Sequence, residues 1–267
     1  MPKVRANGIT INYEQQGAGD PLILIPYLTA DNACYSFQTA DYAKYFTCIS
    51  IDLRGTGESD KPDAAYSTEV LAEDVAAFMQ AVGIPRAHVA GLSLGAATGM
   101  WLAIKYPDRV RSLSLHSAWP KTDPFLQTVV KGWQVMAEGL QSVPETVITG
   151  LFPWCFTPEL YSAKPDYLEA LAAFVRGRPA QPVAAFLHQS NAVVSHDAET
   201  ELGRISAPTQ ITFGRTDMLT SLRFADRMTG IRGSELVIFE GCAHAPIYER
   251  VEEFNQKTLA FLQRHAA

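Results

Sequence analysis

Three residues that lie far apart in the chain have the chemistry of a nucleophile, a base and an acid: Ser93, His244 and Asp217. Ser93 is the centre of Gly91-Leu92-Ser93-Leu94-Gly95, a G-x-S-x-G pattern. The pattern lies between a run of strand residues and a run of helix residues, and such a reversal exposes the central side chain on a strained turn. The flanking glycines let strand and helix approach closely. We therefore interpret Ser93 as a nucleophile rather than as a turn or helix-cap serine.

A serine nucleophile needs a base, and the base needs a group that orients it. Of the six histidines, only His244 lies in a loop that follows a late predicted strand, in the segment GCAHAPIYE. Asp217 lies in the loop after the preceding predicted strand, in QITFGRTDML. The other place for an acid, after residues 113–115, has no acidic residue before Asp123. The sequence therefore predicts that His244 takes the proton of Ser93 and that Asp217 holds the imidazole.

These side chains need a sheet whose strand ends bring them together. The segment before Asn7-Gly8 and the segment after it alternate apolar and polar residues, which predicts a hairpin. Between later runs, residues 67–83 have helical spacing of apolar residues and a serine or threonine cap. Short unbroken apolar runs are typical of parallel strands that are covered on both faces. They occupy residues 22–25, 48–51, 88–90, 113–115, 210–213 and 236–239.

Residues 119–202 break this rhythm of strands and helices. No strand pattern is evident there, aromatic residues are dense, and prolines divide the segment into short helices. Linkers are not this apolar, so we interpret the segment as an inserted helical cap or lid. The predicted core domain is then residues 1–118 together with residues 203–267. A minority of the cap's aromatic side chains should line a cavity.

Composition excludes several classes of protein. The chain has 267 residues, of which 47% are hydrophobic, yet no apolar run approaches the roughly 18 residues of a membrane span and the N-terminal residues have no signal core. The four cysteines form no CxxC pair, which favours reduced thiols in the cytoplasm over disulfides or a metal site. The net charge of −6 disfavours a nucleic-acid partner. A small molecule remains the expected partner, and the oligomeric state is not predicted.

The order Ser93, Asp217, His244 resembles that of the α/β-hydrolase fold family. Two further segments are similar to family motifs: DLRGTGESD at residues 52–60 and HAPIYE at residues 244–249. The resemblance implies a mostly parallel eight-stranded sheet with helices on both faces and an inserted helical cap. It also implies hydrolysis through an acyl-enzyme with no metal or organic cofactor. The first segment lacks the third glycine of a dinucleotide loop, and we interpret its Asp52 and Arg54 as a local charge pair.

The acyl-transfer mechanism also needs donors for an oxyanion. We predict the backbone amides of Leu94, directly after the nucleophile, and of Leu28, in the loop after the predicted strand at residues 22–25. The family commonly has His-Gly in this loop, whereas this chain has Pro26 and Tyr27. Proline cannot donate a hydrogen bond and tyrosine lacks the conformational freedom of glycine.

The resemblance extends to a substrate class. The segment PYLTAD is similar to part of the 3-oxoadipate enol-lactonase group, so we expect a carboxylesterase or lactonase that acts on a small ester or lactone. The predicted substrate-binding residues are Tyr27, Trp133, Trp154 and Arg176, with Arg178 as an alternative contact for a carboxylate. Three other functions stay open: a carbon–carbon bond hydrolase, although Ala245 stands where those relatives carry tryptophan, a perhydrolase, or a ligand sensor with little turnover.

Overall fold

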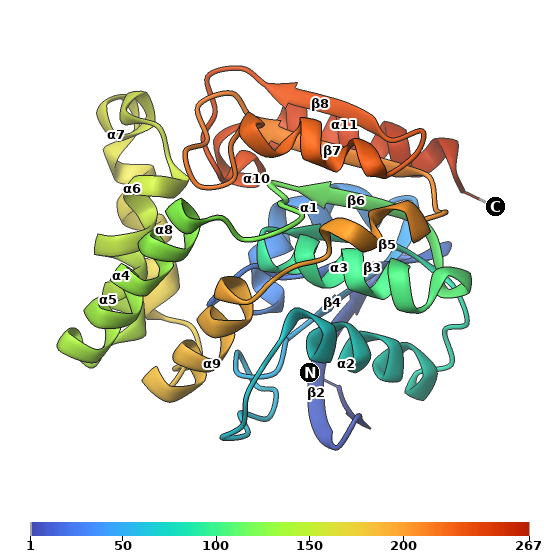
Figure 1. Cartoon of the computed structure of the whole chain (residues 1–267), viewed down its shortest axis with the longest axis horizontal. Helices are drawn as coiled ribbons and strands as arrows, with labels where there is room; N and C mark the ends of the chain where they lie inside the picture. Colours follow the sequence, from blue (N-terminus) through green and yellow to red (C-terminus); the bar gives the residue numbers. More distant parts are fainter. Residues whose placement is uncertain (1, 267) are drawn as a thin grey trace.

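The structure, a computed structural model, describes residues 2–266. Across these residues the chain forms an eight-stranded sheet in the order β1-β2-β4-β3-β5-β6-β7-β8 (Figure 1). The pairs β1–β2 and β2–β4 are antiparallel, and all later pairs are parallel. The predicted mostly parallel sheet is therefore confirmed. The strands are β1 Lys3–Ala6, β2 Ile9–Gln16, β3 Asp20–Ile25, β4 Phe46–Ile51, β5 Ala87–Leu92, β6 Val110–His116, β7 Thr209–Gly214 and β8 Glu235–Phe239.

The hairpin at the start of the sheet is the one that the sequence predicts. Asn7 and Gly8 join β1 to β2 and both have positive φ angles, 45° and 78°. A two-residue turn with this geometry matches the right-handed twist of the strands, and Asn-Gly adopts it at little cost. The hairpin therefore fixes the register in which Lys3 pairs with Asn12.

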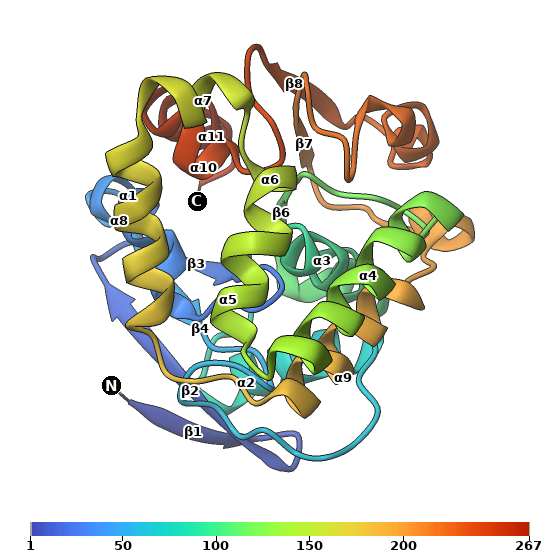
Figure 2. The same cartoon turned by 90° about the vertical axis from the view of Figure 1, so that its left-hand side faces the viewer.

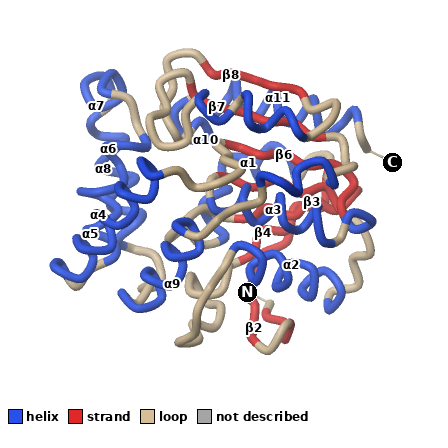
Figure 3. Tube along the Cα trace, in the orientation of Figure 1, coloured by secondary structure: helices blue, strands red, loops and turns tan. Residues whose placement is uncertain are grey.

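The central strands are unbroken apolar runs because both of their faces are covered. In β3, Ile23 and Ile25 belong to the hydrophobic cluster on the side of α2 and α3, whereas Leu22 and Leu24 belong to the cluster on the side of α1 and α11. Figure 3 shows these helices on the two faces of the sheet. The helices of the core are α1 Ser36–Tyr42, α2 Thr68–Ala81, α3 Leu94–Lys105, α10 Pro246–Glu249 and α11 Val251–Arg264.

Helix α2 begins as its sequence indicates. The Ser67 hydroxyl accepts a hydrogen bond from the Val70 amide at 3.2 Å, which caps the helix, and the helix ends before Gly83. Short 3-10 helices connect the remaining parts of the core. They are η1 Asn32–Tyr35, η2 Pro107–Arg109, η4 Glu199–Arg204, η5 Leu222–Phe224 and η6 Asp226–Gly230.

The predicted cap segment is helical and lies over the end of the sheet where the parallel strands finish. Figure 2 shows α4, α5, α6 and α8 in front of that end. The helices are α4 Pro124–Leu140, α5 Val143–Thr146, the π-helix η3 Val147–Leu151, α6 Phe152–Cys155, α7 Pro158–Ala163, α8 Pro165–Arg176 and α9 Val183–Val194. Prolines occupy the first turns of α4 to α8, where their missing N–H costs nothing. The cap boundaries at residues 119 and 202 stay predictions.

The predicted charge pair between Asp52 and Arg54 is wrong. Arg54 pairs instead with Asp74 of α2, at 2.5 Å between Nε and Oδ2. The Asp52 carboxylate is turned inward, where it accepts hydrogen bonds from the Asn32 amide at 2.7 Å and the Glu58 amide at 2.8 Å. The Asp52 carboxylate therefore accepts hydrogen bonds from loop amides and does not pair with Arg54.

Candidate active site

Ser93 lies on a sharp turn between β5 and α3. Its φ and ψ angles are 54° and −116°, a conformation that costs a non-glycine residue free energy. The Ser93 amide donates to the carbonyl oxygen of His116 at 2.9 Å, which ties the turn to β6. A Cβ atom at Gly91 would overlap the Gly95 carbonyl, and one at Gly95 would overlap the Ile25 carbonyl. The two glycines are therefore required for the close approach that the sequence pattern predicts.

His244 and Asp217 form a buried hydrogen-bonded pair. Nδ1 of His244 is 2.9 Å from Oδ2 of Asp217, and the two side chains are 7% and 0% exposed. The other carboxylate oxygen accepts from the amides of Leu219 at 2.8 Å and Thr220 at 3.0 Å. Burial acts to raise the pKa of Asp217, but the interaction with His244 and the hydrogen bonds from Thr220 hold it below its usual value. Asp217 is therefore ionised and can orient an imidazole.

Two residues that the sequence analysis missed hold this pair in place. The Thr220 hydroxyl is 2.9 Å from Asp217 Oδ2, 3.2 Å from His244 Nδ1 and 2.9 Å from the Ser117 carbonyl oxygen. The Ser117 hydroxyl donates to the carbonyl oxygen of His244 at 2.8 Å. Neither residue belongs to a motif, because each acts through a contact that only the folded chain creates.

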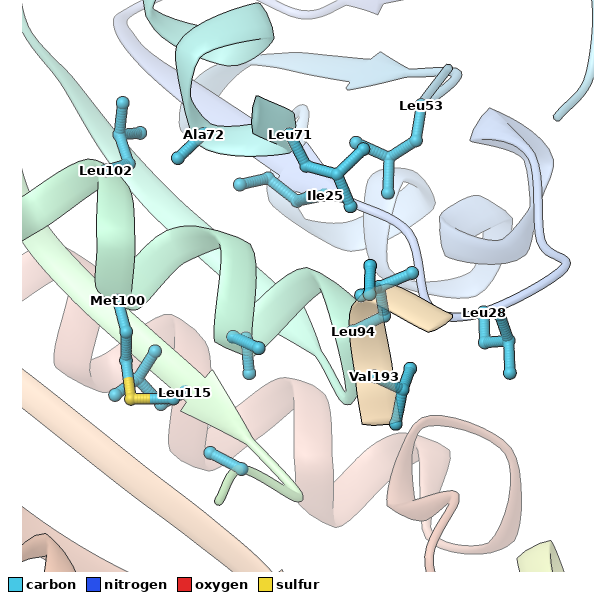
Figure 4. Close-up of a cluster of buried hydrophobic side chains, with 14 of the residues drawn as sticks. Ile25, Leu28, Leu53, Leu71, Ala72, Leu94, Met100, Leu102, Leu115 and Val193 are labelled. Carbon is cyan, nitrogen blue, oxygen red and sulfur yellow. The ribbon is translucent and has the colours of Figure 1, made fainter. Parts of the chain in front are cut away.

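The predicted oxyanion donors lie on either side of a close contact between the start of α3 and the end of β3. Leu94 is the first residue of α3, so its amide has no partner within the helix. Leu28 lies in the loop after β3, whose carbonyls at Ile25 and Pro26 face Gly95 of that helix. Figure 4 shows the side chains of Leu28 and Leu94 near Val193, in one hydrophobic cluster.

The loop after β3 is held by packing rather than by a glycine. The Tyr27 hydroxyl is 2.9 Å from that of Tyr248, and the two rings meet edge to face. Thr29 has a φ of 72°, and its amide donates to Oε1 of Gln189, a buried side chain of the cap helix α9, at 3.3 Å. Contacts from both the core and the cap therefore hold the loop after β3, in which Pro26 and Tyr27 replace the family's His-Gly.

A cavity of about 120 Å³ lies between the core and the cap. Ser93 and His244 both line it, so the cavity brings together two of the three predicted catalytic side chains, while Asp217 stands behind the imidazole. Leu28, Tyr27 and Trp133 also line the wall. The indole nitrogen of Trp133 donates to the Gly150 carbonyl at 3.0 Å, so the ring offers the cavity an apolar face.

Two predicted substrate-binding residues lie elsewhere. Trp154 packs its ring against Phe125, with ring centroids 6.0 Å apart, and is not among the residues that line the cavity. Arg176 is on the outside of the cap, where its Nε donates to Glu145 at 2.8 Å. The arginine on the cavity wall is Arg178, beyond the C-terminus of α8, which pairs with Asp31 at 2.7 Å. A single residue, Gly177, separates the exposed Arg176 from Arg178, which lines the cavity.

The histidine loop is joined to the cap by three hydrogen bonds that involve Glu249 and by one backbone bond. One carboxylate oxygen of Glu249 accepts from the amide and the hydroxyl of Thr157, at 2.7 and 2.8 Å, and the other accepts from the Ala243 amide at 2.6 Å. The Ala245 amide donates to the carbonyl oxygen of Cys155 at 3.1 Å. The residues on both sides of His244 are therefore fixed to the start of α7 and the end of α6.

The thiol of Cys242, near His244, behaves as a buried filler. Burial raises its pKa well above the usual range, and no group of three or more potential metal ligands occurs within residues 2–266. Over the same residues, every helix is too short or too polar to cross a membrane.

Comparisons with known proteins agree with this architecture. A family model described as alpha/beta hydrolase fold matches residues 21–251. RutD of Azorhizobium caulinodans, provisionally named a carbamate hydrolase, is 27% identical over 98% of both chains. The 3-oxoadipate enol-lactonase 2 of Acinetobacter baylyi is 27% identical over 97% of this chain and 95% of its own. Among solved structures, Est816, described as an N-acyl homoserine lactone degrading enzyme, superposes with a TM-score of 0.83 at 26% identity, covering 97% of this chain and 100% of its own.

Proposed function

Because the chain belongs to the α/β-hydrolase fold family, whose members similar to it are hydrolases, we propose that it is a serine hydrolase that cleaves a small carboxylic ester or lactone. The observation that carries the proposal is the buried His244–Asp217 pair, together with the presence of Ser93 and His244 on the wall of one cavity. An enol-lactonase and a lactone-degrading enzyme among the similar proteins support acyl transfer as the reaction class.

In the first half of the reaction, the Ser93 hydroxyl oxygen attacks the acyl carbon while Nε2 of His244 takes its proton. The hydrogen bond between Nδ1 of His244 and Asp217 fixes the tautomer that leaves Nε2 free to accept. The ionised carboxylate also stabilises the imidazolium that forms. His244 then gives the proton to the leaving oxygen, the bond to the alcohol breaks, and an acyl-enzyme results.

The negative charge of the tetrahedral intermediate develops on the former carbonyl oxygen. The amides of Leu94 and Leu28 are the proposed donors, and the N-terminal end of α3 adds the favourable end of a helix dipole. In the second half, His244 takes a proton from water, the resulting hydroxide attacks the acyl carbon, and the bond to Ser93 breaks with return of the proton to the serine oxygen.

The proposal is tested by labelling and turnover together. A fluorophosphonate should modify Ser93, as located by mass measurement of the digested protein, and the wild type should hydrolyse short p-nitrophenyl esters. Ser93→Ala should lower kcat by on the order of 10⁶-fold. Ser195→Ala, which removes an exposed hydroxyl on the cap, is the matched control and should keep its activity. Label on another residue, or equal rates for wild type and Ser93→Ala, would overturn the proposal.

A ligand sensor is the second candidate, because Pro26 and Tyr27 replace His-Gly in the loop that carries the Leu28 amide. A sensor on this fold would turn over slower than about once per minute on every ester tested, against an enzyme median near 10 per second. Fast turnover of any ester in the panel would dismiss this candidate.

A further inference from the structure

We infer that the cavity selects acyl groups that carry no charge, and that Asp31 sets this preference by neutralising Arg178 on the cavity wall. The inference rests on the proposed acyl-transfer function and names the substrate class of the same site. It differs from the acidic substrate that the resemblance to enol-lactonases implies.

The cavity wall is mostly apolar. Besides Ser93 and His244, its polar side chains are the Asp31–Arg178 ion pair and uncharged groups, namely Tyr27, Thr29, Gln181, Thr220 and Tyr248. Among the described residues that line it, Asp31 and Arg178 are the oppositely charged side chains, and their charges sum to zero. The cap helices α4, η3, α6 and α9 contribute aliphatic or aromatic groups. Examples are Leu126, Val130, Val147, Leu151, Phe152 and Val193.

Asp31 and Arg178 are both held in place by the ion pair and by their other neighbours. Nε of Arg178 donates to Oδ2 of Asp31 at 2.7 Å, and Oδ1 of Asp31 accepts from the Ala33 amide at 3.1 Å. The Asp31 side chain is 5% exposed and that of Arg178 is 31% exposed. The guanidinium carbon also lies 5.4 Å from the centre of the Phe174 ring. Asp31 cannot turn away, because the same carboxylate caps the helix η1.

The surroundings of Asp31 favour negative rather than positive potential. Burial, together with the charges of Asp31 and of a second buried carboxyl, Asp52, raises the pKa of the Cys34 thiol. Burial also raises the pKa values of Tyr27, Tyr248 and Cys155 on the wall, so these groups are uncharged near neutral pH. No positive charge among the described wall residues is therefore left uncompensated at neutral pH.

A carboxylate on the acyl chain would enter this cavity at a cost. It would lose its hydration and meet an arginine whose charge Asp31 already balances, so the desolvation would not be repaid. A methyl group at the same place would contact aliphatic side chains and gain from leaving water. The oxyanion of the tetrahedral intermediate differs from such a carboxylate, because the proposed amide donors of Leu28 and Leu94 stabilise its charge.

The test uses two esters that differ only in the end of the acyl chain. In p-nitrophenyl hexanoate the chain ends in a methyl group, and in mono-p-nitrophenyl adipate a carboxylate takes its place. We expect the kcat/KM of the wild type to be at least about 100-fold higher for the hexanoate. This is the size of effect expected when a charge enters a protein cavity without a compensating partner. Comparable kcat/KM values for the two esters in the wild type would overturn the inference.

Substitutions in the Asp31–Arg178 ion pair then test whether this pair causes the preference for the uncharged ester. Asp31→Asn keeps a side chain that can cap η1 but leaves Arg178 without its counter-charge, and should narrow the ratio of the two kcat/KM values at least about tenfold. The double variant Asp31→Asn with Arg178→Gln should return the ratio toward the wild-type value, because the gain requires the guanidinium. A ratio that Asp31→Asn does not change would overturn the role of Asp31. Because each variant is compared with itself on two esters, a partial loss of folded protein does not alter the ratio.

Binding to Ser93→Ala separates failure of this inference from failure of the proposed function. Calorimetric titration with methyl hexanoate and with monomethyl adipate reports the cavity's preference without turnover. Tighter binding of the uncharged ester with no hydrolysis by the wild type would contradict the proposed function and retain the inference. Equal binding of the two esters would overturn the inference even if the wild type hydrolyses both.

Discussion

At the scale of single residues, the candidate site depends on side chains that act through their neighbours. Asp217 accepts hydrogen bonds from two amides, a hydroxyl and an imidazole, so its carboxylate has one orientation. Thr220 supplies two of these donors, its amide and its hydroxyl. The hydroxyl therefore helps to orient His244, and Thr220 also lines the cavity.

Replacement of Thr220 by valine tests this positioning role. Valine keeps the shape of the side chain but removes the hydroxyl, and a hydrogen bond to a charged group contributes about 1.5–3 kcal/mol. We expect kcat for p-nitrophenyl esters to fall about 10- to 100-fold. Thr220→Ser retains the hydroxyl and should recover most of the rate. If valine and serine lower kcat equally, the hydroxyl has no positioning role.

At this scale the sequence predicts the residues that belong to a motif, but not the contacts of the others. The Ser93 turn has the strained backbone that its pattern predicts, and His244 bonds to the carboxylate assigned to it. Arg176 and Arg178 cannot be told apart in the sequence, because the turn after α8 decides which guanidinium meets Asp31 and which meets Glu145. The predicted pair of Asp52 and Arg54 is wrong for the same reason, because the partners of both side chains lie elsewhere in the chain.

At the scale of elements, the close approach of β3, β5 and α3 is what places Ser93 beside the loop of Leu28. Gly95 and Gly99 lie one turn apart on α3, yet only Gly95 faces backbone. A Cβ at Gly99 would lie 3.4 Å from a methyl group of Leu113, the movable end of a side chain. The two glycines therefore form a matched pair for substitution.

Gly95→Ala should destabilise the protein and disturb the site, whereas Gly99→Ala should not. An added methyl group against the carbonyl of Ile25 forces a backbone shift, for which overpacking costs about 1–3 kcal/mol. At Gly99, the better helix propensity of alanine, worth about 1 kcal/mol, offsets the tighter contact. Urea unfolding and ester hydrolysis measure the two effects. Equal stability of both variants would contradict the close approach at Gly95.

Glu249 provides a second prediction at this scale, because it connects the histidine loop to the cap. Glu249→Ala removes the acceptor for three donors and should lower the free energy of unfolding by about 2–4 kcal/mol. It should also lower kcat, since the Ala243 amide next to His244 loses its anchor. Glu252→Gln, an exposed acidic residue on α11, is the control. A Glu249→Ala protein as stable and active as the control would show that the bridge does not hold the loop.

The sequence predicts elements better than their contacts. The unbroken apolar runs predict β3 to β8, and the Asn-Gly turn predicts the β1–β2 hairpin. Burial on both faces explains the runs of the central strands, whereas β8 is an apolar edge strand that is partly exposed. The cap segment reads as helical from its prolines and aromatic residues, but which aromatic side chains line the cavity depends on how each short helix is rotated. Trp133 lines the wall and Trp154 packs on Phe125 for that reason.

At the scale of the whole molecule, buried neutral histidines make stability depend on pH. Burial lowers the pKa of His88 and of His196 to about 4 and that of His116 to about 3. In the unfolded chain they would titrate near 6.5. His196 also joins the cap to the core through the Thr68 hydroxyl at 2.9 Å, and its other ring nitrogen is 3.1 Å from the Trp119 carbonyl oxygen within the cap.

The free energy of unfolding should therefore fall as the pH is lowered from about 6.5 toward 4. In this window the unfolded state binds protons that the folded state does not, so each histidine contributes a slope of up to about 1.4 kcal/mol per pH unit. Urea unfolding at pH 7.0, 6.0 and 5.0 measures the slope. His196→Gln should reduce it by one histidine's share. Stability that stays constant between pH 7 and 5 would contradict the neutral, buried state of these rings.

The hydrogen bonds from Cys155 and Thr157 to the loop around His244 restrict how a molecule can reach Ser93. An outward movement of α6 and α7 would move the His244 imidazole away from Asp217 and break their hydrogen bond. Substrate must then enter the cavity, and product must leave it, past another part of the cap. The stretch around Arg178 and Phe174 is joined to the core through the Arg178–Asp31 pair rather than to the residues directly beside His244. It is therefore the part of the cap that can move, by breaking that ion pair, while His244 and Asp217 stay together.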